Sequence, residues 1–206
     1  MDKVQSQKTL KQTLRHYVRA MAFVVCGIVI IGSVGTYYAR THQVPQQVTT
    51  IDIPVATRSQ PIRLRIPALA IDTTFVPPLL LNADQTVSVP DSYTRVGWYA
   101  NGPTPGEVGP AVILGHVDSK DGPAIFYPLG RLKRGDTIEV EKEDKTVAIF
   151  EVVNLVRYPQ DSFPTEEVYG KTDLPTLRLV TCTGIFNKGI QRYSHNLVVY
   201  ATLKTN

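Results

Sequence analysis

Cysteine is scarce in this sequence, which has only Cys26 and Cys182 among its 206 residues. Small secreted domains stapled by disulfides carry far more cysteine, so a disulfide-rich scaffold is excluded. Proline is absent from the first 44 residues, and all fifteen prolines lie between Pro45 and Pro175. Each proline inside a helix removes a backbone hydrogen bond at a cost of about 3 kcal/mol, so this long segment is not expected to form a helical bundle.

An excess of charge is also absent from most of the chain. Residues 1–19 hold five basic residues and one acidic residue, whereas the remaining residues hold seventeen of each sign. A protein that binds nucleic acid needs a basic stripe on its folded domain to displace counterions from the phosphates. Because the surplus is confined to a short tail, the sequence predicts no nucleic-acid partner.

Residues 20–39 form one uninterrupted run without a formal charge. A helix of that length is about 30 Å long, which matches the hydrocarbon core of a bilayer. Basic residues precede the run, so we expect a single-pass transmembrane anchor at 20–39, a cytoplasmic tail at 1–19 and an exported body. A cleaved signal peptide is the alternative, but its apolar region is usually about 7 to 15 residues long. A buried soluble helix is disfavoured because it would normally have a polar face.

Residues 40–60 are polar and interrupted by proline, so we expect an extracellular stalk there. The folded body is expected at 61–206, where apolar residues fall into short β-branched runs bounded by Gly, Pro, Asp and Asn. The clear runs are residues 63–78, 111–117, 136–142, 146–158, 176–183 and 196–204. Helical periodicity occurs only near 124–132 and 166–169. A closed or nearly closed barrel leaves few bare strand edges, so the sequence predicts a mainly β, barrel-like domain with short helices.

Cys182 is the candidate nucleophile. It ends an apolar run and is followed by Thr183 and Gly184, and sites often lie where a strand gives way to a loop. Since Cys26 falls in the predicted span, the two cysteines cannot pair, and Cys182 is an unpaired exported thiol. Such a thiol is either a reactive group or an intermolecular crosslink. The residues alone leave a third interpretation open, a buried inert cysteine that packs like a small hydrophobe.

A thiol nucleophile needs an imidazole that can protonate the leaving group. Of the four histidines, His16 and His42 flank the predicted membrane span, which leaves His116 and His195. Either of these could be an ordinary surface side chain. His116 is favoured because it closes an apolar run and opens a loop rich in Gly and Asp, so it is expected at a strand end.

Acyl transfer also needs a donor that stabilises the developing oxyanion. Arg192 lies ten residues after Cys182, just before the last predicted strand, so a hairpin would return it beside the thiol. Arg157, Arg178 and Lys188 are rivals on spacing alone. No Cys/His cluster has the spacing of metal ligands and no Gly-rich phosphate loop is present, so the sequence predicts neither a metal nor a cofactor.

Three segments together resemble the sortases, the membrane-anchored cysteine transpeptidases of bacterial surfaces. They are ILGH at 113–116, LVTC at 179–182 and RYSHNLVVYA at 192–201. The similarity covers about residues 60–204, and the run 115–140 looks most like the class F sortases. Sortases usually carry T-L-x-T-C, and here Arg178 stands where the first Thr would be.

The resemblance implies a closed sortase-like β-barrel of about eight strands at 61–206, in the plasma membrane of a bacterium. It implies that Cys182 attacks a peptide carbonyl in an LPxTG-like sorting signal of an exported protein and forms a thioester. An amine of a peptidoglycan precursor or of a pilin would then resolve the thioester. His116 would protonate the leaving amine, and Arg192 would hold the substrate backbone and stabilise the oxyanion.

Two other classes of protein remain open at this stage. An L,D-transpeptidase-like enzyme that crosslinks the wall also uses a β-rich domain and an exported cysteine, but its S-H-G-C core is absent around Cys182. A non-catalytic membrane-anchored barrel for assembly or adhesion would need Cys182 and His116 only for packing. A thiol that reacts in a manner dependent on His116 would favour the enzymes.

Overall fold

The computed structural model describes residues 58–205. The predicted cytoplasmic tail, the predicted span at 20–39 and nearly all of the predicted stalk lie outside the described residues. Within residues 58–205, no helix is long and apolar enough to cross a membrane.

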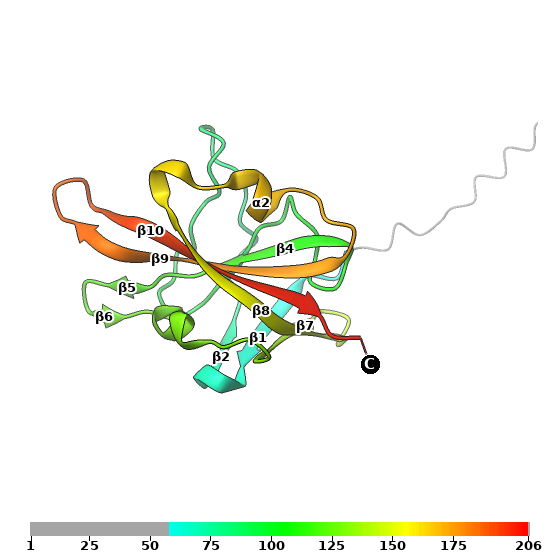
Figure 1. Cartoon of the computed structure of the whole chain (residues 1–206). Coiled ribbons are helices and arrows are strands. Elements are labelled where there is room, and N and C mark those ends of the chain that lie inside the picture. The colour runs from blue at the N-terminus through cyan, green and yellow to red at the C-terminus, as the bar shows by residue number, and fades with distance from the viewer. Residues whose placement is uncertain (1–57, 206) are drawn as a thin grey trace, which may run out of the picture. The chain divides into compact units, whose positions relative to one another are not determined.

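Strands make up most of the described domain (Figure 1). One sheet has eight strands in the order β2-β1-β7-β8-β10-β9-β4-β3. Their bounds are β1 Pro61–Ile66, β2 Ile71–Thr74, β3 Gly97–Trp98, β4 Gly109–Leu114, β7 Thr137–Lys142, β8 Val147–Pro159, β9 Pro175–Asn187 and β10 Arg192–Leu203. A small separate hairpin pairs β5 Asp118–Ser119 with β6 Gly122–Pro123. The helical pieces are short: η1 Pro67–Leu69, η2 Tyr127–Arg131, η3 Gln160–Ser162 and α2 Thr165–Tyr169.

The mainly β fold and the sheet of eight strands confirm the sequence prediction. Each of the six predicted runs overlaps a strand, and the run 63–78 is divided by the turn at Pro67–Leu69 into β1 and β2. The two segments with helical periodicity contain η2 and α2. Proline at the start of η1 explains the division, because its ring fixes φ and its nitrogen cannot donate to a strand ladder.

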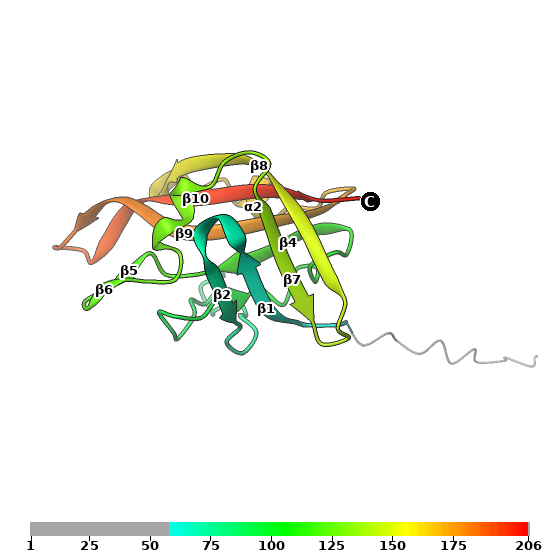
Figure 2. The same cartoon turned by 90° about the horizontal axis from the view of Figure 1, so that it is seen from below.

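The sheet is curled, so that β1, β2 and β7 lie on the opposite side of β4, β9 and β10 from α2 (Figures 1 and 2). Its two edges do not join through a strand ladder. Phe75 and Val96, which lie just outside β2 and β3, form an isolated parallel bridge, and the Val76 amide donates to the Val96 carbonyl at 2.8 Å. The predicted closed barrel is therefore corrected to a curled half-barrel, because the edge strand β3 has only two residues with which to pair.

Two apolar clusters lie on the two faces of the sheet. Side chains alternate along a strand, so Leu177 and Leu179 of β9 point into the main core inside the curl, and both are fully buried. Val180 instead joins a smaller cluster with Val168 of α2. By the same alternation, Cys182 faces the α2 side of the sheet. The fold therefore places the thiol between the sheet and the segment that carries α2.

Gly115 follows β4 and lies against a core phenylalanine. A Cβ at residue 115 would stand 2.5 Å from Cδ2 of Phe126, whose side chain is fully buried. We expect Gly115→Ala to lower the free energy of unfolding by about 1 to 3 kcal/mol, the usual cost of overpacking a core. Urea denaturation measures this change. Gly130→Ala is the matched control, because its nearest atoms would lie at ordinary contact distances of 3.6 and 3.7 Å; equal losses in both variants would contradict the packing argument.

Candidate active site

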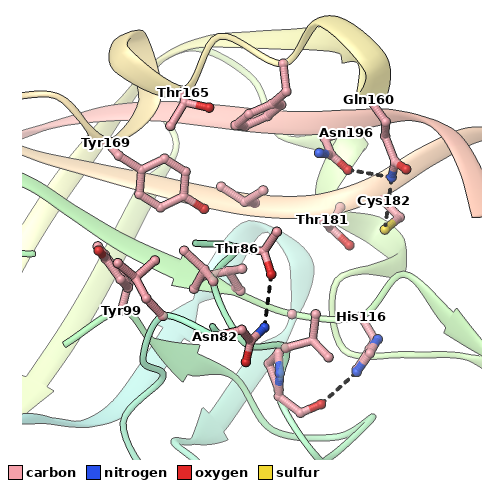
Figure 3. Close-up of a pocket in the computed structure, with 18 of the residues that line it drawn as sticks. Asn82, Thr86, Tyr99, His116, Gln160, Thr165, Tyr169, Thr181, Cys182 and Asn196 are labelled. Atoms are coloured by element: carbon pink, nitrogen blue, oxygen red, sulfur yellow. Dashed lines mark hydrogen bonds between the residues drawn. The ribbon is translucent and has the colours of Figure 1, made fainter. Parts of the chain in front are cut away.

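A pocket of about 710 Å³ opens on the α2 side of the sheet. Its wall is formed by the ends of β4 and β9, by the loop around residues 81–90 and by the segment 160–169 (Figure 3). Cys182, His116 and Arg192 all line this pocket. The structure therefore brings the three predicted site residues to one cavity.

The parallel pairing of β4 with β9 brings His116 and Cys182 together. Leu114 pairs with Val180, and the Gly115 amide donates to the Val180 carbonyl at 3.1 Å. His116 and Cys182 each lie two residues beyond this pair, so they occur at the same level of the sheet. His116 follows the end of β4 as predicted, whereas β9 continues to Asn187. Cys182 thus lies within a long strand, at the point where that strand loses its neighbour β4.

The His116 ring is fixed by backbone and aromatic contacts. Its Nε2 lies 2.8 Å from the carbonyl oxygen of Pro90, and its ring centroid lies 4.7 Å from that of Tyr93. A carbonyl oxygen can only accept a hydrogen bond, so Nε2 must carry a proton. The other ring nitrogen, Nδ1, makes no hydrogen bond within residues 58–205. Nδ1 is therefore the nitrogen that can exchange a proton with a substrate.

His195 has a different environment from His116. It lies in β10 opposite Thr183, its Nδ1 lies 2.8 Å from Oγ of Ser194, and it does not line the pocket. Of the two candidate histidines, only His116 reaches the cavity that holds Cys182.

The hairpin of β9 and β10 returns Arg192 to the pocket, as its spacing predicted. The guanidinium is held by η3: Nε donates to Oε1 of Gln160 at 2.5 Å, and Nη1 lies 3.2 Å from Oδ1 of Asp161. The Arg192–Asp161 ion pair is solvent-exposed, so it contributes little to stability. The hydrogen bond to Gln160 is the contact that directs Arg192 into the site.

The three rival cations do not line the pocket. Arg157 is exposed on β8, and Lys188 is exposed in the turn between β9 and β10. Arg178 is buried, with its guanidinium 4.4 Å from the ring centroid of Tyr200. The residue that replaces the usual first Thr of the motif therefore packs against the sheet instead of facing the site.

Gln160 and Asn196 are site residues that the sequence analysis missed. Gln160 Nε2 lies 3.7 Å from Sγ of Cys182 and donates to Oδ1 of Asn196 at 2.9 Å (Figure 3). Asn196 pairs with Cys182 in the register of β9 and β10. The only sequence signal for Gln160 was its position two residues after a long predicted strand, which does not show where the side chain points.

The charge state of the thiol follows from its surroundings. Burial raises the pKa of Cys182, the hydrogen bond from Gln160 lowers it, the Asp118 carboxylate raises it, and the Arg192 cation lowers it. Burial dominates, so the pKa of Cys182 is above its usual range and the thiolate is a minor species at neutral pH. Asp118 also accepts a hydrogen bond from the Tyr193 hydroxyl, which raises the pKa of Tyr193 to about 12.

The residues that the structure describes contain no group of side chains suited to a metal ion. In the range 58–205, no three side chains among His, Cys, Asp and Glu are grouped so that they could hold a metal ion.

Comparisons with known proteins agree with this geometry. The family model described as the Sortase domain matches residues 64–204. Among solved structures, sortase C-1 of Actinomyces oris is 19% identical, with 71% of this chain and 76% of that chain covered and a TM-score of 0.53. Sortase A of Corynebacterium diphtheriae is also 19% identical, with 74% and 64% covered and a TM-score of 0.53. None of the curated protein sequences matches significantly.

These solved structures share the fold of this chain. The resemblance of residues 115–140 to class F sortases stays a prediction. The family match favours the sortase interpretation over the wall-crosslinking and non-catalytic alternatives. Since the family model matches more than half of the chain and includes β4, β9 and β10, the chain belongs to the sortase family, whose members are cysteine transpeptidases.

Proposed function

We propose that this chain cleaves an LPxTG-like sorting signal of an exported protein and transfers the acyl group to an amine of a peptidoglycan precursor or pilin. The observation that carries the proposal is the common pocket of Cys182, His116 and Arg192, at the ends of the paired parallel segments of β4 and β9. The resemblance of residues 115–140 to class F sortases is part of the same proposal.

The walls of the pocket suit such a peptide. Its volume lies within the range of about 300 to 1,000 Å³ that is typical of ligand pockets. Leu81, Val87, Phe163 and Tyr169 supply apolar surface, which suits the leucine and proline of a sorting signal. Polar side chains also line the pocket, both beside Cys182, where Gln160 and Asn196 lie, and farther from it, where Asn82, Thr86 and Thr165 lie (Figure 3). The pocket therefore offers a peptide both apolar surface and hydrogen-bonding groups next to the reactive thiol.

The residues can perform two acyl transfers. In the first, the Cys182 thiolate attacks the scissile carbonyl, the C–N bond breaks, and His116 gives the proton from Nδ1 to the leaving amine. In the second, the incoming amine attacks the thioester, His116 accepts its proton, and the thiolate leaves. The reactive state needs a thiolate and an imidazolium together. Because burial raises the pKa of Cys182, this state is a small fraction of the enzyme, and slow turnover follows.

Arg192 is proposed to act through directed hydrogen bonds as well as through charge. Lys keeps the charge but has no planar fork, so it cannot reproduce the Nε contact with Gln160. We expect Arg192→Lys to lower kcat by about 10² to 10³, the scale of one lost oxyanion donor, with a smaller change in KM. Steady-state peptide cleavage measures both constants. Arg157→Lys on the exposed face of β8 is the control; a loss in the control with none in Arg192→Lys would refute the assignment.

We also propose that residues 20–39 anchor the chain in the plasma membrane of a bacterium, with the N-terminus in the cytoplasm and the catalytic domain outside. The charge pattern of the sequence supports this topology. Protease added to intact cells stripped of their wall is expected to digest the domain at 61–206. Complete protection of the domain, with digestion after lysis, would contradict the proposed topology.

The cleavage reaction itself is tested with the full 206-residue chain and a set of peptides that carry different sorting signals. Mass spectrometry is expected to show cleavage of LPxTG-like peptides and transfer of the N-terminal fragment to an added amine. Scrambled peptides of the same composition are the control. Equal cleavage of signal and scrambled peptides, or none of either, would overturn the proposed function.

A further inference from the structure

We propose that Gln160 is a further catalytic residue, whose Nε2 donates a hydrogen bond to the oxyanion formed when Cys182 attacks a carbonyl. This inference rests on the proposed acyl transfer at Cys182 and adds a donor to that site. The contacts of the Gln160 amide carry it: Nε2 faces Sγ of Cys182 (Figure 3), and Oε1 accepts a hydrogen bond from Nε of Arg192.

The orientation of the Gln160 amide is fixed by chemistry. Arg192 has only hydrogen-bond donors, so the group that faces its Nε must be the carbonyl oxygen Oε1. The NH₂ group then faces Cys182 and Asn196. Asn196 Oδ1 accepts one of its hydrogens at 2.9 Å, which leaves the other directed at Sγ. The reverse orientation would place NH₂ against a guanidinium and is excluded.

The distance to the sulfur places this donor where charge develops. Nε2 lies 3.7 Å from Sγ. When Sγ bonds to the carbonyl carbon, the carbonyl π electrons move to the oxygen, which becomes an oxyanion two bonds from the sulfur. An effective donor lies about 2.7 to 3.1 Å from that oxygen. A donor already held beside Sγ reaches this range without a rearrangement of the site. The stabilisation of the oxyanion ends when the carbonyl re-forms and the C–N bond breaks.

Arg192 contacts the carbonyl end of the Gln160 amide group. Its Nε hydrogen bond polarises the Gln160 carbonyl, and hydrogen bonds in a chain strengthen one another, so the Nε2–H becomes a stronger donor. Its Nη1 is paired with Asp161, the next residue of η3. In this arrangement Arg192 positions the amide in addition to its proposed role as an oxyanion donor, and Gln160 adds a second directed contact with the reacting oxygen.

The test compares two reactions of the same thiol in the full chain, in a Cys26→Ala background that leaves Cys182 as the single thiol. Acylation by p-nitrophenyl acetate passes through an oxyanion and needs no proton for its leaving group. Alkylation by iodoacetamide displaces iodide directly and forms no oxyanion. With both rates measured at the high-pH plateau where the thiolate is saturated, we expect Gln160→Ala to lower the acylation rate by about 10² and the alkylation rate at least tenfold less.

Gln160→Glu keeps the size of the side chain and its contact with Arg192 but lacks the N–H donors. In this variant, which retains the local packing, we again expect a larger loss in the acylation rate than in the alkylation rate. Gln60→Ala, which removes an exposed glutamine outside the pocket, should leave both rates unchanged. Equal losses in the acylation and alkylation rates would show that Gln160 acts only on the thiolate. No loss in either rate would show that Gln160 has no role in the reaction. Either result would overturn the proposal. Because the ester needs no sorting signal, failure of peptide cleavage would refute the proposed function without deciding this inference.

Discussion

Replacing Cys182 by alanine is expected to abolish cleavage of sorting-signal peptides and to leave the fold intact. No other thiol lines the pocket, so turnover should fall below detection. The thiol lies on the α2 side of the sheet at the pocket and is not part of either apolar cluster, so its loss opens no cavity in the core. Chromatographic peptide cleavage and thermal denaturation measure the two effects.

Cys26→Ala is the matched control for this prediction. Cys26 falls in the predicted membrane span, outside the described residues, so its removal should leave turnover unchanged. Retention of activity by Cys182→Ala, or its loss in Cys26→Ala alone, would remove the basis of the proposed mechanism.

The second large effect is expected for His116. His116→Ala should lower kcat by about 10² to 10⁴, the range for a lost general acid and base, because the leaving amine then has no proton donor. Steady-state cleavage of a sorting-signal peptide measures the loss. The acylation of Cys182 by p-nitrophenyl acetate should fall less, since its leaving group requires no proton.

His195→Ala is the control for the histidine prediction. His195 lies in β10 outside the pocket and should affect kcat little. The opposite ranking of the two variants would move the acid and base role to His195 and would contradict the geometry of β4 and β9.

Local patterns predicted the longer strands well because each of them carries its own signal, whereas the two-residue strands β3, β5 and β6 carry none and were not predicted. The runs that became β7, β8, β9 and β10 are β-branched and bounded by turn residues. Closure of the barrel was not predictable in the same way. It depends on how the segment between β2 and β3 meets its neighbours, and residues 75–96 mix apolar residues with Pro, Asp and Asn without a period. Edge pairing is a long-range property that local sequence does not encode.

The site shows the same division between local and long-range information. His116 and Cys182 were recognisable from their residue type and their place after apolar runs. Their shared level in the sheet depends on the parallel register of β4 and β9, which connects residues 66 positions apart along the chain in the pair Leu114 and Val180. Gln160 became a neighbour of Cys182 through two strand registers, that of β8 with β10, which pairs Pro159 with His195, and that of β10 with β9, which pairs Asn196 with Cys182. No local pattern marks that contact.

Arg178 was a rival to Arg192 from sequence, and its environment explains why it is not in the site. It lies between Leu177 and Leu179, so strand alternation directs it to the face away from the main core. On that face it is buried over the Tyr200 ring, where Tyr200 in turn donates to Glu167 of α2 at 3.1 Å. The Arg178 guanidinium therefore packs on the Tyr200 ring, and the Tyr200 hydroxyl connects the sheet to α2.

The central claim is that Cys182 carries the acyl group, and intact-protein mass spectrometry tests it most directly. The full chain is mixed with an LPxTG-like peptide and quenched in acid during turnover. The predicted result is an added mass equal to the N-terminal peptide fragment, which peptide mapping places on Cys182 and which hydroxylamine removes as expected for a thioester. Two results would contradict the mechanism. One is an acyl fragment on another residue, or an added mass that hydroxylamine does not remove. The other is an unlabelled Cys182 in a sample that is cleaving the peptide.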